Sequence, residues 1–335
     1  MKVLLSFILS AACILTFSVV HAEDMLTGAG ATFPAPIYQA WAYDYNRTTG
    51  IKLNYQPIGS GGGIQQIKSR TVEFGASDAP LTPEELNKDG LLQFPAVMGG
   101  VVLAVNVPGI KAGELKLDSD AVCKVYLGDI KYWDDSKLKA LNPKANLPHT
   151  EITVVHRSDG SGTTAIFTTY LSETCPDWNT KVGHGTSVKW PLGIGGKGNE
   201  GVSNYVHQAP AAIGYVEFAY AKLNNLSYTA LKNSAGKFIE PSFEAFEDAA
   251  ASANFDPKKH FDLWLVNAPG KNAWPIAGAT FILLAKDRKE ADKKTIQFYD
   301  WSFKNGDAKA KELIYVPLPK SLKDKIRAYW KENGI

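Results

Sequence analysis

The sequence predicts an α/β protein built from two domains, and three observations support this fold class. Segments with the pattern of a strand alternate with segments of helical spacing along the whole chain. Removing a predicted leader of 22 residues from the 335 leaves 313, enough for two domains of ordinary size. No long charged or low-complexity linker divides the chain, so we expect crossing strands to join the domains as a hinge.

Strands and helices are assigned in order from hydrophobic pattern and from residues that start or stop helices. The predicted strands are 25–27, 51–58, 72–76, 152–156, 213–216 and 279–284. The predicted helices include one from Pro34 that stops at Gly50, one through Ile64 and Ile67, one opened by Thr82 and Pro83, and helices over 163–171 and 321–333.

The first residues have the composition of a secretory signal. Lys2 is followed by an apolar run over 3–20, and Val20 and Ala22 are the small residues expected before a cleavage site. We therefore predict a cleaved signal peptide over 1–22, with an uncleaved membrane anchor as the alternative.

The charge balance of the chain is almost neutral. The sequence has 36 basic and 34 acidic residues, and Lys2 leaves with the signal, so the processed chain would carry +1. Proteins that bind nucleic acid or a membrane surface need a basic excess, so the near-neutral charge argues against these two classes.

Two cysteines remain after Cys13 is removed with the signal. An even pair in an oxidising compartment favours one disulfide between Cys123 and Cys175, with two buried thiols as the alternative. Neither cysteine nor any histidine pair has the spacing of a metal site, so we expect no metal and no cofactor.

Three loops share a composition that suits an anion. Each follows a strand, contains glycine with Ser or Thr, and precedes a helix; they lie at 28–34, 59–63 and 159–164. Glycine lets the backbone approach a ligand closely, and the first turn of a helix presents N–H groups without internal partners. Three such termini converging would surround a small tetrahedral oxyanion.

Arg157 and Asp78 are the charged candidates beside these loops. Asp159 could hold the guanidinium of Arg157 in place, although these two residues could also form only a surface ion pair.

Five stretches of the chain have the form of known motifs, at 26–36, 74–80, 157–163, 189–199 and 212–217. They closely resemble those of the phosphate-specific periplasmic binding proteins, the PstS family. The resemblance covers essentially the whole processed chain. It implies the two-lobed periplasmic-binding-protein fold of type II, in which each lobe is a central mixed sheet flanked by helices and the ligand cleft lies between the lobes. Lobe I would comprise 23–97 and 269–335, and lobe II would comprise 98–268.

The resemblance also implies a set of binding residues and partners. The phosphate ligands carried over by motif are Thr32, Phe33 through its N–H, Ser60, Asp78, Arg157, Ser161, Gly162 and Thr163, with Asp159 orienting Arg157. Gly61 stands where some relatives have a second serine, and His156 stands where a basic residue is common; neither is a proposed contact. The implied protein is a periplasmic monomer that captures inorganic phosphate and delivers it to the membrane permease of an ABC transporter.

Asp78 is the predicted selectivity residue. Two negative charges about 4 Å apart repel by roughly 4 kcal/mol at an effective dielectric near 20, which is about a thousandfold in affinity. A carboxylate in an anion site therefore needs a ligand that brings a proton, and phosphate has a P–OH at neutral pH whereas sulfate has none.

Three other functions compete with this one. A secreted phosphatase would need a nucleophile with a base or a metal site, and no such group is recognisable. Residues 193–198 satisfy the glycine pattern of a dinucleotide-binding loop, but no buried strand precedes them, so we expect a loop that leads to Asn199 as a helix cap. A binding protein for another oxyanion is the third alternative, and Asp78 argues against sulfate.

Overall fold

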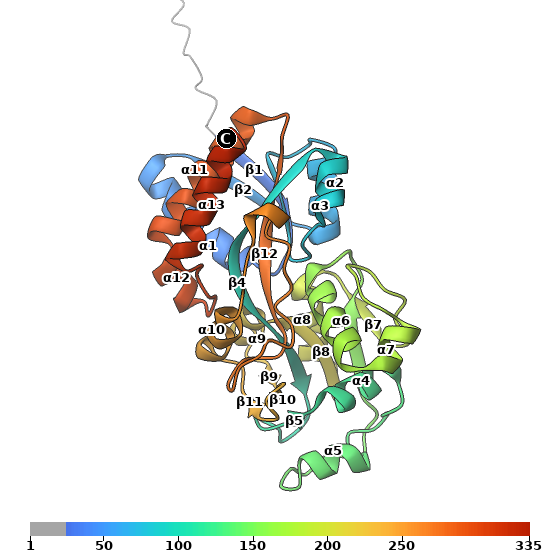
Figure 1. The fold of residues 1–335 in the computed structure, drawn as a ribbon. Helices are drawn as coiled ribbons and strands as arrows, with labels where there is room; N and C mark the ends of the chain where they lie inside the picture. The colour runs from blue at the N-terminus through green and yellow to red at the C-terminus, as the bar shows by residue number, and fades with distance from the viewer. Residues whose placement is uncertain (1–24) are drawn as a thin grey trace, which may run out of the picture.

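The computed structural model describes residues 25–335, and the predicted signal peptide at 1–22 lies outside them. Nine strands of this part form one sheet in the order β2-β1-β3-β12-β4-β8-β6-β7, with β9 also paired to β4. At its centre, β4 (Leu91–Asn106) and β12 (Ala277–Ala285) pair antiparallel. Figure 1 shows these two strands in the middle of the molecule, between two groups of helices and strands. The predicted α/β fold of two lobes joined by crossing strands is confirmed.

The first lobe contains the N-terminal elements and the C-terminal helices. Its strands β1 and β2 are parallel, β1 and β3 are parallel, and β3 pairs antiparallel with β12. Its elements are β1 (Met25–Gly30), α1 (Ala35–Thr49), β2 (Lys52–Pro57), α2 (Ser60–Lys68), β3 (Phe74–Ser77), α3 (Pro83–Asp89), α11 (Lys289–Asn305), α12 (Asp307–Glu312) and α13 (Lys320–Glu332). The 3₁₀ helix η1 (Pro257–Lys259) reaches α13, since the ring of His260 bonds the Tyr329 hydroxyl at 2.6 Å.

The second lobe is built on the C-terminal half of β4. From Val101 onward this strand pairs antiparallel with β8, while β8, β6 and β7 are parallel to one another. The elements are β5 (Lys116–Leu117), α4 (Ser119–Leu127), α5 (Ser136–Leu141), β6 (Thr153–Arg157), α6 (Gly162–Thr174), α7 (Pro176–Lys181), β7 (Ile194–Gly196), α8 (Gly198–Gln208), β8 (Ala212–Glu217), α9 (Phe218–Leu223), β9 (Ser227–Tyr228), β10 (Ala230–Lys232), β11 (Phe238–Ile239) and α10 (Phe243–Ala251). The predicted division at 97/98 falls within β4 and the one at 268/269 falls before β12; both stay predictions.

Local sequence explains where several helices begin and end. α1 ends at Gly50, whose left-handed backbone (φ 77°) is the conformation that favours glycine. α3 has a full capping box, because Thr82 accepts from the N–H of Glu85 and the Glu85 carboxylate accepts from the N–H of Thr82. Both predicted boundaries are confirmed.

The glycine-rich segment at 59–63 differs from the prediction. It was expected to be a loop, but α2 begins at Ser60 and includes its last three glycines. The reason is close packing of this helix on the sheet, since a Cβ on Gly63 would lie 2.5 Å from the Cα of Gly30 and 2.8 Å from the carbonyl oxygen of Ala76. Because glycine has no side chain, the N-terminus of α2 can pack directly against the ends of β1 and β3.

Each lobe has its own aromatic core. In the first lobe, the rings of Tyr38, Tyr55, Phe74 and Tyr299 pack mainly edge to face. In the second lobe, the cluster contains Tyr126, Phe167, Trp190 and Tyr215. Both ring clusters lie within one hydrophobic core that is continuous between the lobes.

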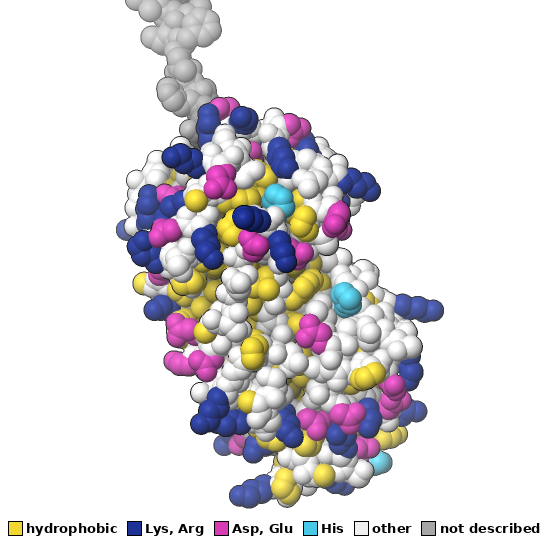
Figure 2. Space-filling model, in the orientation of Figure 1, with side chains coloured by type: hydrophobic (Ala, Val, Ile, Leu, Met, Phe, Trp, Pro, Cys, Tyr) yellow, Lys and Arg dark blue, Asp and Glu magenta, His cyan; other side chains and the backbone are white. Residues whose placement is uncertain are grey.

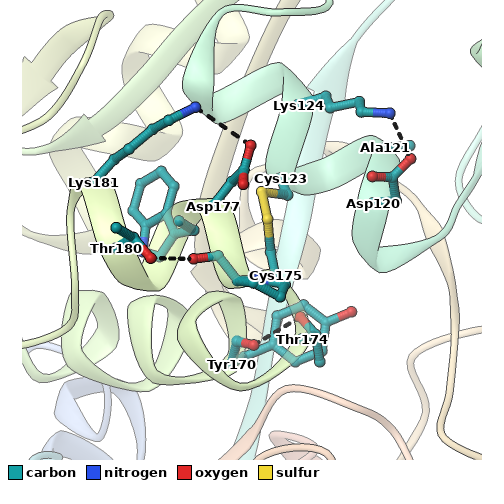
Figure 3. Close-up of a disulfide and its surroundings, with 12 residues drawn as sticks. Asp120, Ala121, Cys123, Lys124, Tyr170, Thr174, Cys175, Asp177, Thr180 and Lys181 are labelled. Carbon is teal, nitrogen blue, oxygen red and sulfur yellow. Dashed lines mark hydrogen bonds and ion pairs between the residues drawn. A yellow bond between two sulfur atoms is a disulfide. The ribbon is translucent and has the colours of Figure 1, made fainter.

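The structure joins Cys123 and Cys175 in a disulfide, the pairing that the sequence favoured over two free thiols. Figure 3 shows that it links α4 to the junction between α6 and α7. Both cysteines are buried within the second lobe. The disulfide therefore holds the C-terminal end of α6, opposite the end that carries predicted ligands.

The surface agrees with the near-neutral composition. Figure 2 shows basic and acidic side chains interspersed over one face of both lobes. Among residues 25–335, no helix has the length and apolar character required to span a membrane.

Candidate anion-binding site

The predicted site residues follow the carboxyl ends of parallel strands, where α/β sheets commonly bind ligands. Strand β1 ends before the loop with Thr32 and Phe33, β3 ends before Asp78, and β6 ends at Arg157. The eight predicted ligands are all buried: Thr32, Phe33, Ser60, Asp78, Arg157, Ser161, Gly162 and Thr163. The structure brings residues of both lobes into one buried cluster.

Ser60 bridges the two lobes directly. Its Oγ accepts hydrogen bonds from the N–H of Asp78 at 3.1 Å and from the N–H of Gly162 at 3.0 Å. Beside it, the N–H of Gly61 donates to the carbonyl oxygen of Gly160 at 2.9 Å. A Cβ on Gly160 would lie only 3.1 Å from the Cα of Gly61, so this contact needs residues without side chains. The structure therefore shows the lobes closed on each other.

Arg157 is held rigidly inside the cluster. Its side chain is 1% exposed, and its guanidinium donates to both carboxylate oxygens of Asp159, from Nε at 2.8 Å and from Nη2 at 2.5 Å. The remaining nitrogen, Nη1, lies 3.4 Å from Oγ1 of Thr163. This bidentate pair is buried, so the alternative of a surface ion pair is excluded for Arg157 and Asp159.

The carboxylate of Asp159 is stabilised in its charged form. Burial alone would raise its pKa, but the hydrogen bonds and charge of Arg157 and the N–H of Gly198 at 3.0 Å together lower the pKa below its usual range. Asp159 thus keeps the guanidinium in place at any pH near neutrality, with Nη1 directed toward the predicted ligands.

Asp78 keeps one carboxylate oxygen unused in this cluster. It is 2% exposed, and its Oδ1 accepts the hydroxyl hydrogen of Thr280 at 2.7 Å. Its Oδ2 is buried and has no hydrogen-bond partner among residues 25–335. Burial raises the pKa of Asp78 to about 7, against the lowering effects of Thr280, the charge of Arg157 and the Ser60 hydroxyl. No ion pair neutralises this carboxyl within the described residues, so Oδ2 can exchange a proton with a ligand near neutral pH.

Buried backbone donors complete the cluster. Within residues 25–335, the N–H groups of Phe33, Ser60 and Thr163 make no hydrogen bond that the structure shows, although all three residues are buried. Ser60 and Thr163 lie in the first turns of α2 and α6, where N–H groups have no partner within the helix. Ser161 caps α6 by accepting from the N–H of Thr164 at 3.0 Å. Unpaired buried N–H groups are costly, and an anion would satisfy them.

Three residues that the sequence did not assign to the site take part in it. Asn199 lies inside α8, whose N-cap is Lys197, so its expected role as a helix cap is wrong. Its side chain instead contacts both Thr32 and Thr163, at 2.7 and 3.2 Å. Thr280, in β12, holds Asp78, and no local sequence signal could have identified it because 202 positions separate the two.

Glu217 is the third unexpected member. Its Oε2 accepts from the N–H of Ala219 and lies 2.8 Å from the hydroxyl of Tyr315, whose single hydrogen is shared with the carbonyl oxygen of Phe33 at 2.7 Å. Burial raises the pKa of Glu217 to about 8, the charge of Asp78 adds to this, and the hydrogen bonds from Ala219 and Tyr315 oppose it. This residue therefore links the second lobe to the loop of Phe33 in the first.

The segment at 193–198 does not have the geometry of a dinucleotide-binding loop. Residues 194–196 form the edge strand β7, paired parallel with β6, so the predicted loop is wrong for these three residues. The turn into α8 brings the N–H of Gly198 to Asp159 instead.

Comparison with known proteins gives consistent matches over most of the chain. The family model described as a PBP superfamily domain matches residues 19–305. The chain is 52% identical over 307 residues to the phosphate-binding protein PstS of Xylella fastidiosa (strain Temecula1), covering 91% of this chain and 84% of that protein. It is 52% identical over 310 residues to PstS of Haemophilus influenzae, covering 92% and 93%.

Solved structures with the same fold include other phosphate-binding proteins. One is a high affinity periplasmic phosphate-binding protein, PfluDING, bound with phosphate, with a TM-score of 0.70 and 21% identity over 90% of this chain and 93% of that one. Another is the phosphate binding protein from Stenotrophomonas maltophilia, with a TM-score of 0.69 and 20% identity over 91% and 93%. At this level of identity the two structures show the fold that the chain shares.

Proposed function

The chain belongs to the PBP superfamily and, within it, to the PstS proteins, and we propose that it binds inorganic phosphate between its lobes and delivers it to an ABC-type import complex. The observation that carries this proposal is the composition of the buried cluster. It combines Arg157, several hydroxyls and unpaired N–H groups with the free carboxylate oxygen Oδ2 of Asp78. Phosphate fits this set because it offers several oxygens that accept and one hydroxyl that donates.

The proposed ligands come from both lobes. Thr32, Phe33, Ser60 and Asp78 belong to the first, and Arg157, Ser161, Gly162 and Thr163 belong to the second, with Asp159 positioning Arg157. A ligand that contacts both groups binds the closed form better than the open form, so phosphate would stabilise closure. The lobe boundaries at 97/98 and 268/269 are part of this proposal.

Asp78 supports selectivity for phosphate over sulfate. When Asp78 is ionised, an anion without a proton would face an uncompensated charge, which costs roughly 4 kcal/mol at 4 Å and an effective dielectric near 20. A protonated phosphate can instead donate to Oδ2. The raised pKa adds a condition, because sulfate is excluded in this way only while Asp78 is ionised.

We infer binding rather than hydrolysis, and a location outside the cytoplasm. In residues 25–335, the hydroxyls of Ser60 and Ser161 bond backbone N–H groups rather than a histidine that could act as a base. The predicted signal peptide at 1–22 supports a periplasmic monomer that works with membrane permease subunits. A phosphomonoester assay that released product would contradict the first inference.

Calorimetric titration of the processed chain tests the proposal. We expect saturable binding of phosphate with one site and no detectable heat from sulfate at pH 8.5. Absence of phosphate binding would refute the function, and equal binding of both anions would refute the role of Asp78.

A further inference from the structure

The orientation of the Asn199 side chain is determined by its neighbours. Its Oδ1 accepts the N–H of Glu217 at 2.9 Å, and a backbone N–H can only donate. The amide oxygen must therefore face Glu217, and the NH₂ group must face the opposite side, where the hydroxyls of Thr32 and Thr163 lie. This assignment follows from the hydrogen-bond network, which is how amide orientations are decided.

Each of the two hydroxyl oxygens has both of its acceptor positions occupied. Oγ1 of Thr32 accepts from the backbone N–H of Asn199 at 3.2 Å and from its Nδ2 at 2.7 Å. Oγ1 of Thr163 accepts from Nδ2 of Asn199 at 3.2 Å and from Nη1 of Arg157 at 3.4 Å. A hydroxyl has two lone pairs and one hydrogen, so the hydrogen is the only bonding group left on either hydroxyl. Within residues 25–335 the structure shows no hydrogen bond donated by these two hydroxyls.

We propose that Asn199 is a positioning residue that directs the hydroxyl hydrogens of Thr32 and Thr163 to the bound anion. The proposal rests on the phosphate site proposed above and adds a determinant of specificity to it. A hydroxyl that was free to rotate could accept from a P–OH group as well as donate to a P–O⁻ group. With Asn199 in place both threonines can only donate, which leaves Asp78 as the acceptor for the ligand's proton.

Asn199 also connects the lobes. It belongs to α8 of the second lobe, whereas Thr32 belongs to the loop after β1 of the first, and the side chain is fully buried between them. The hydrogen bonds to Thr32 can therefore form only when the lobes are closed, so the threonine of the first lobe receives its orientation at the moment when the ligand is enclosed.

A double-mutant cycle on the processed chain tests the proposal, with phosphate affinity measured by calorimetry. We expect Asn199→Ala and Thr163→Val each to weaken phosphate binding about tenfold, because each loses or disorders a hydrogen bond to a charged ligand. The fold loss of affinity in the double variant should be clearly smaller than the product of the two single losses. Without Asn199 the Thr163 hydroxyl is already misdirected, so its removal should cost little more. The same cycle with Thr32→Val should also be non-additive.

Asn142→Ala is the matched control. Asn142 is also buried, but within residues 25–335 its side chain bonds only backbone groups of Lys116 and Leu138, so this change should lower Tm without changing phosphate affinity. If Asn199→Ala does not fold, Asn199→Ser takes its place in the cycle with the same expectation. Two results would overturn the positioning role in a parent that binds phosphate. One is an Asn199→Ala variant with the affinity of the parent, and the other is a double variant whose fold loss equals the product of the two single losses. A parent that does not bind phosphate would instead refute the proposed function itself.

Discussion

The hydroxyl of Thr280 donates to Oδ1 of Asp78 at 2.7 Å, from the strand β12 to the end of β3. This bond uses one carboxylate oxygen and leaves Oδ2 as the free one. It also opposes the rise in the pKa of Asp78 that burial causes, so the carboxyl titrates at about 7 instead of higher. The pairing therefore determines both which oxygen meets the ligand and the pH range in which that oxygen is charged.

Asp78→Asn should damage discrimination more than phosphate affinity. An amide can still accept from P–OH through its oxygen, and it can donate to sulfate through its NH₂ group. In the parent, sulfate binding should be absent at pH 8.5 and detectable at pH 5.5, because the pKa of Asp78 is about 7 and the protonated carboxyl can donate. The variant should bind sulfate at both pH values. Competition titrations would contradict the assignment if the variant excluded sulfate as well as the parent does.

Arg157→Ala should weaken phosphate binding by about 2 kcal/mol or more, which is roughly thirtyfold, because the guanidinium is buried and loses charged hydrogen bonds. Arg70→Ala is a suitable control, since Arg70 pairs with the exposed Asp287 at 3.0 Å on the first lobe, away from the site. The control should leave affinity unchanged by calorimetry. An equal affinity for Arg157→Ala and the parent would remove Arg157 from the ligand set.

Gly162→Ala should prevent closure without unfolding either lobe. A Cβ there would lie 2.6 Å from the Cβ of Asp78 and closer still to Oγ of Ser60, both in the other lobe. We expect at least about a hundredfold loss of phosphate affinity, which corresponds to about 3 kcal/mol. The Tm of the phosphate-free protein should change little. Small-angle scattering should show no compaction when phosphate is added. Compaction equal to that of the parent would mean that the lobes accommodate the methyl group.

Replacing both Cys123 and Cys175 by serine should lower stability and leave affinity nearly unchanged. A disulfide with a sequence separation of 52 contributes about 2–4 kcal/mol, largely by restricting the unfolded chain. The disulfide lies at the C-terminal end of α6 (Figure 3). The predicted ligands Ser161, Gly162 and Thr163 lie at the N-terminal end of the same helix. Thermal unfolding and calorimetry of the same samples would measure both effects. A large loss of affinity at full folding would show that the disulfide also positions the ligands.

The phosphate-free protein should become less stable as pH rises from about 4.5 to about 8. The pKa of Glu217 is raised to about 8 in the folded state, so its contribution is fully present below its ordinary value of 4.5 and is lost as pH rises through about 8. Glu217→Gln should therefore flatten the fall of Tm between about pH 5 and pH 8, with little difference between the curves above that range. Asp292→Asn is the comparison, because Asp292 is also buried but its pKa is about 7, raised by burial and by Asp287, and its effect should appear at lower pH. Parallel curves for Glu217→Gln and the parent would place Glu217 in contact with water or a cation.

Local chemistry explains why so much of the fold was predictable from the sequence. The proline at 34, the glycine at 50 and the capping box of Thr82 act within a few residues of themselves, and the structure shows the predicted boundaries there. The alternation of strands and helices and the glycine-rich loops are equally local. The segment at 59–63 was less predictable because its helical form depends on packing against β1 and β3.

The sequence by itself determined the α/β class, the two-lobed fold and the residues that could form an anion site, because spacing, turn residues and motif are properties of neighbouring positions. The tertiary structure alone decided how these residues act. It placed Thr280 on one oxygen of Asp78 and left the other free, and it turned Asn199 from an expected helix cap into a contact with Thr32 and Thr163. Hydrogen-bond direction and burial arise between segments that are distant along the chain, so only the packed structure determines them.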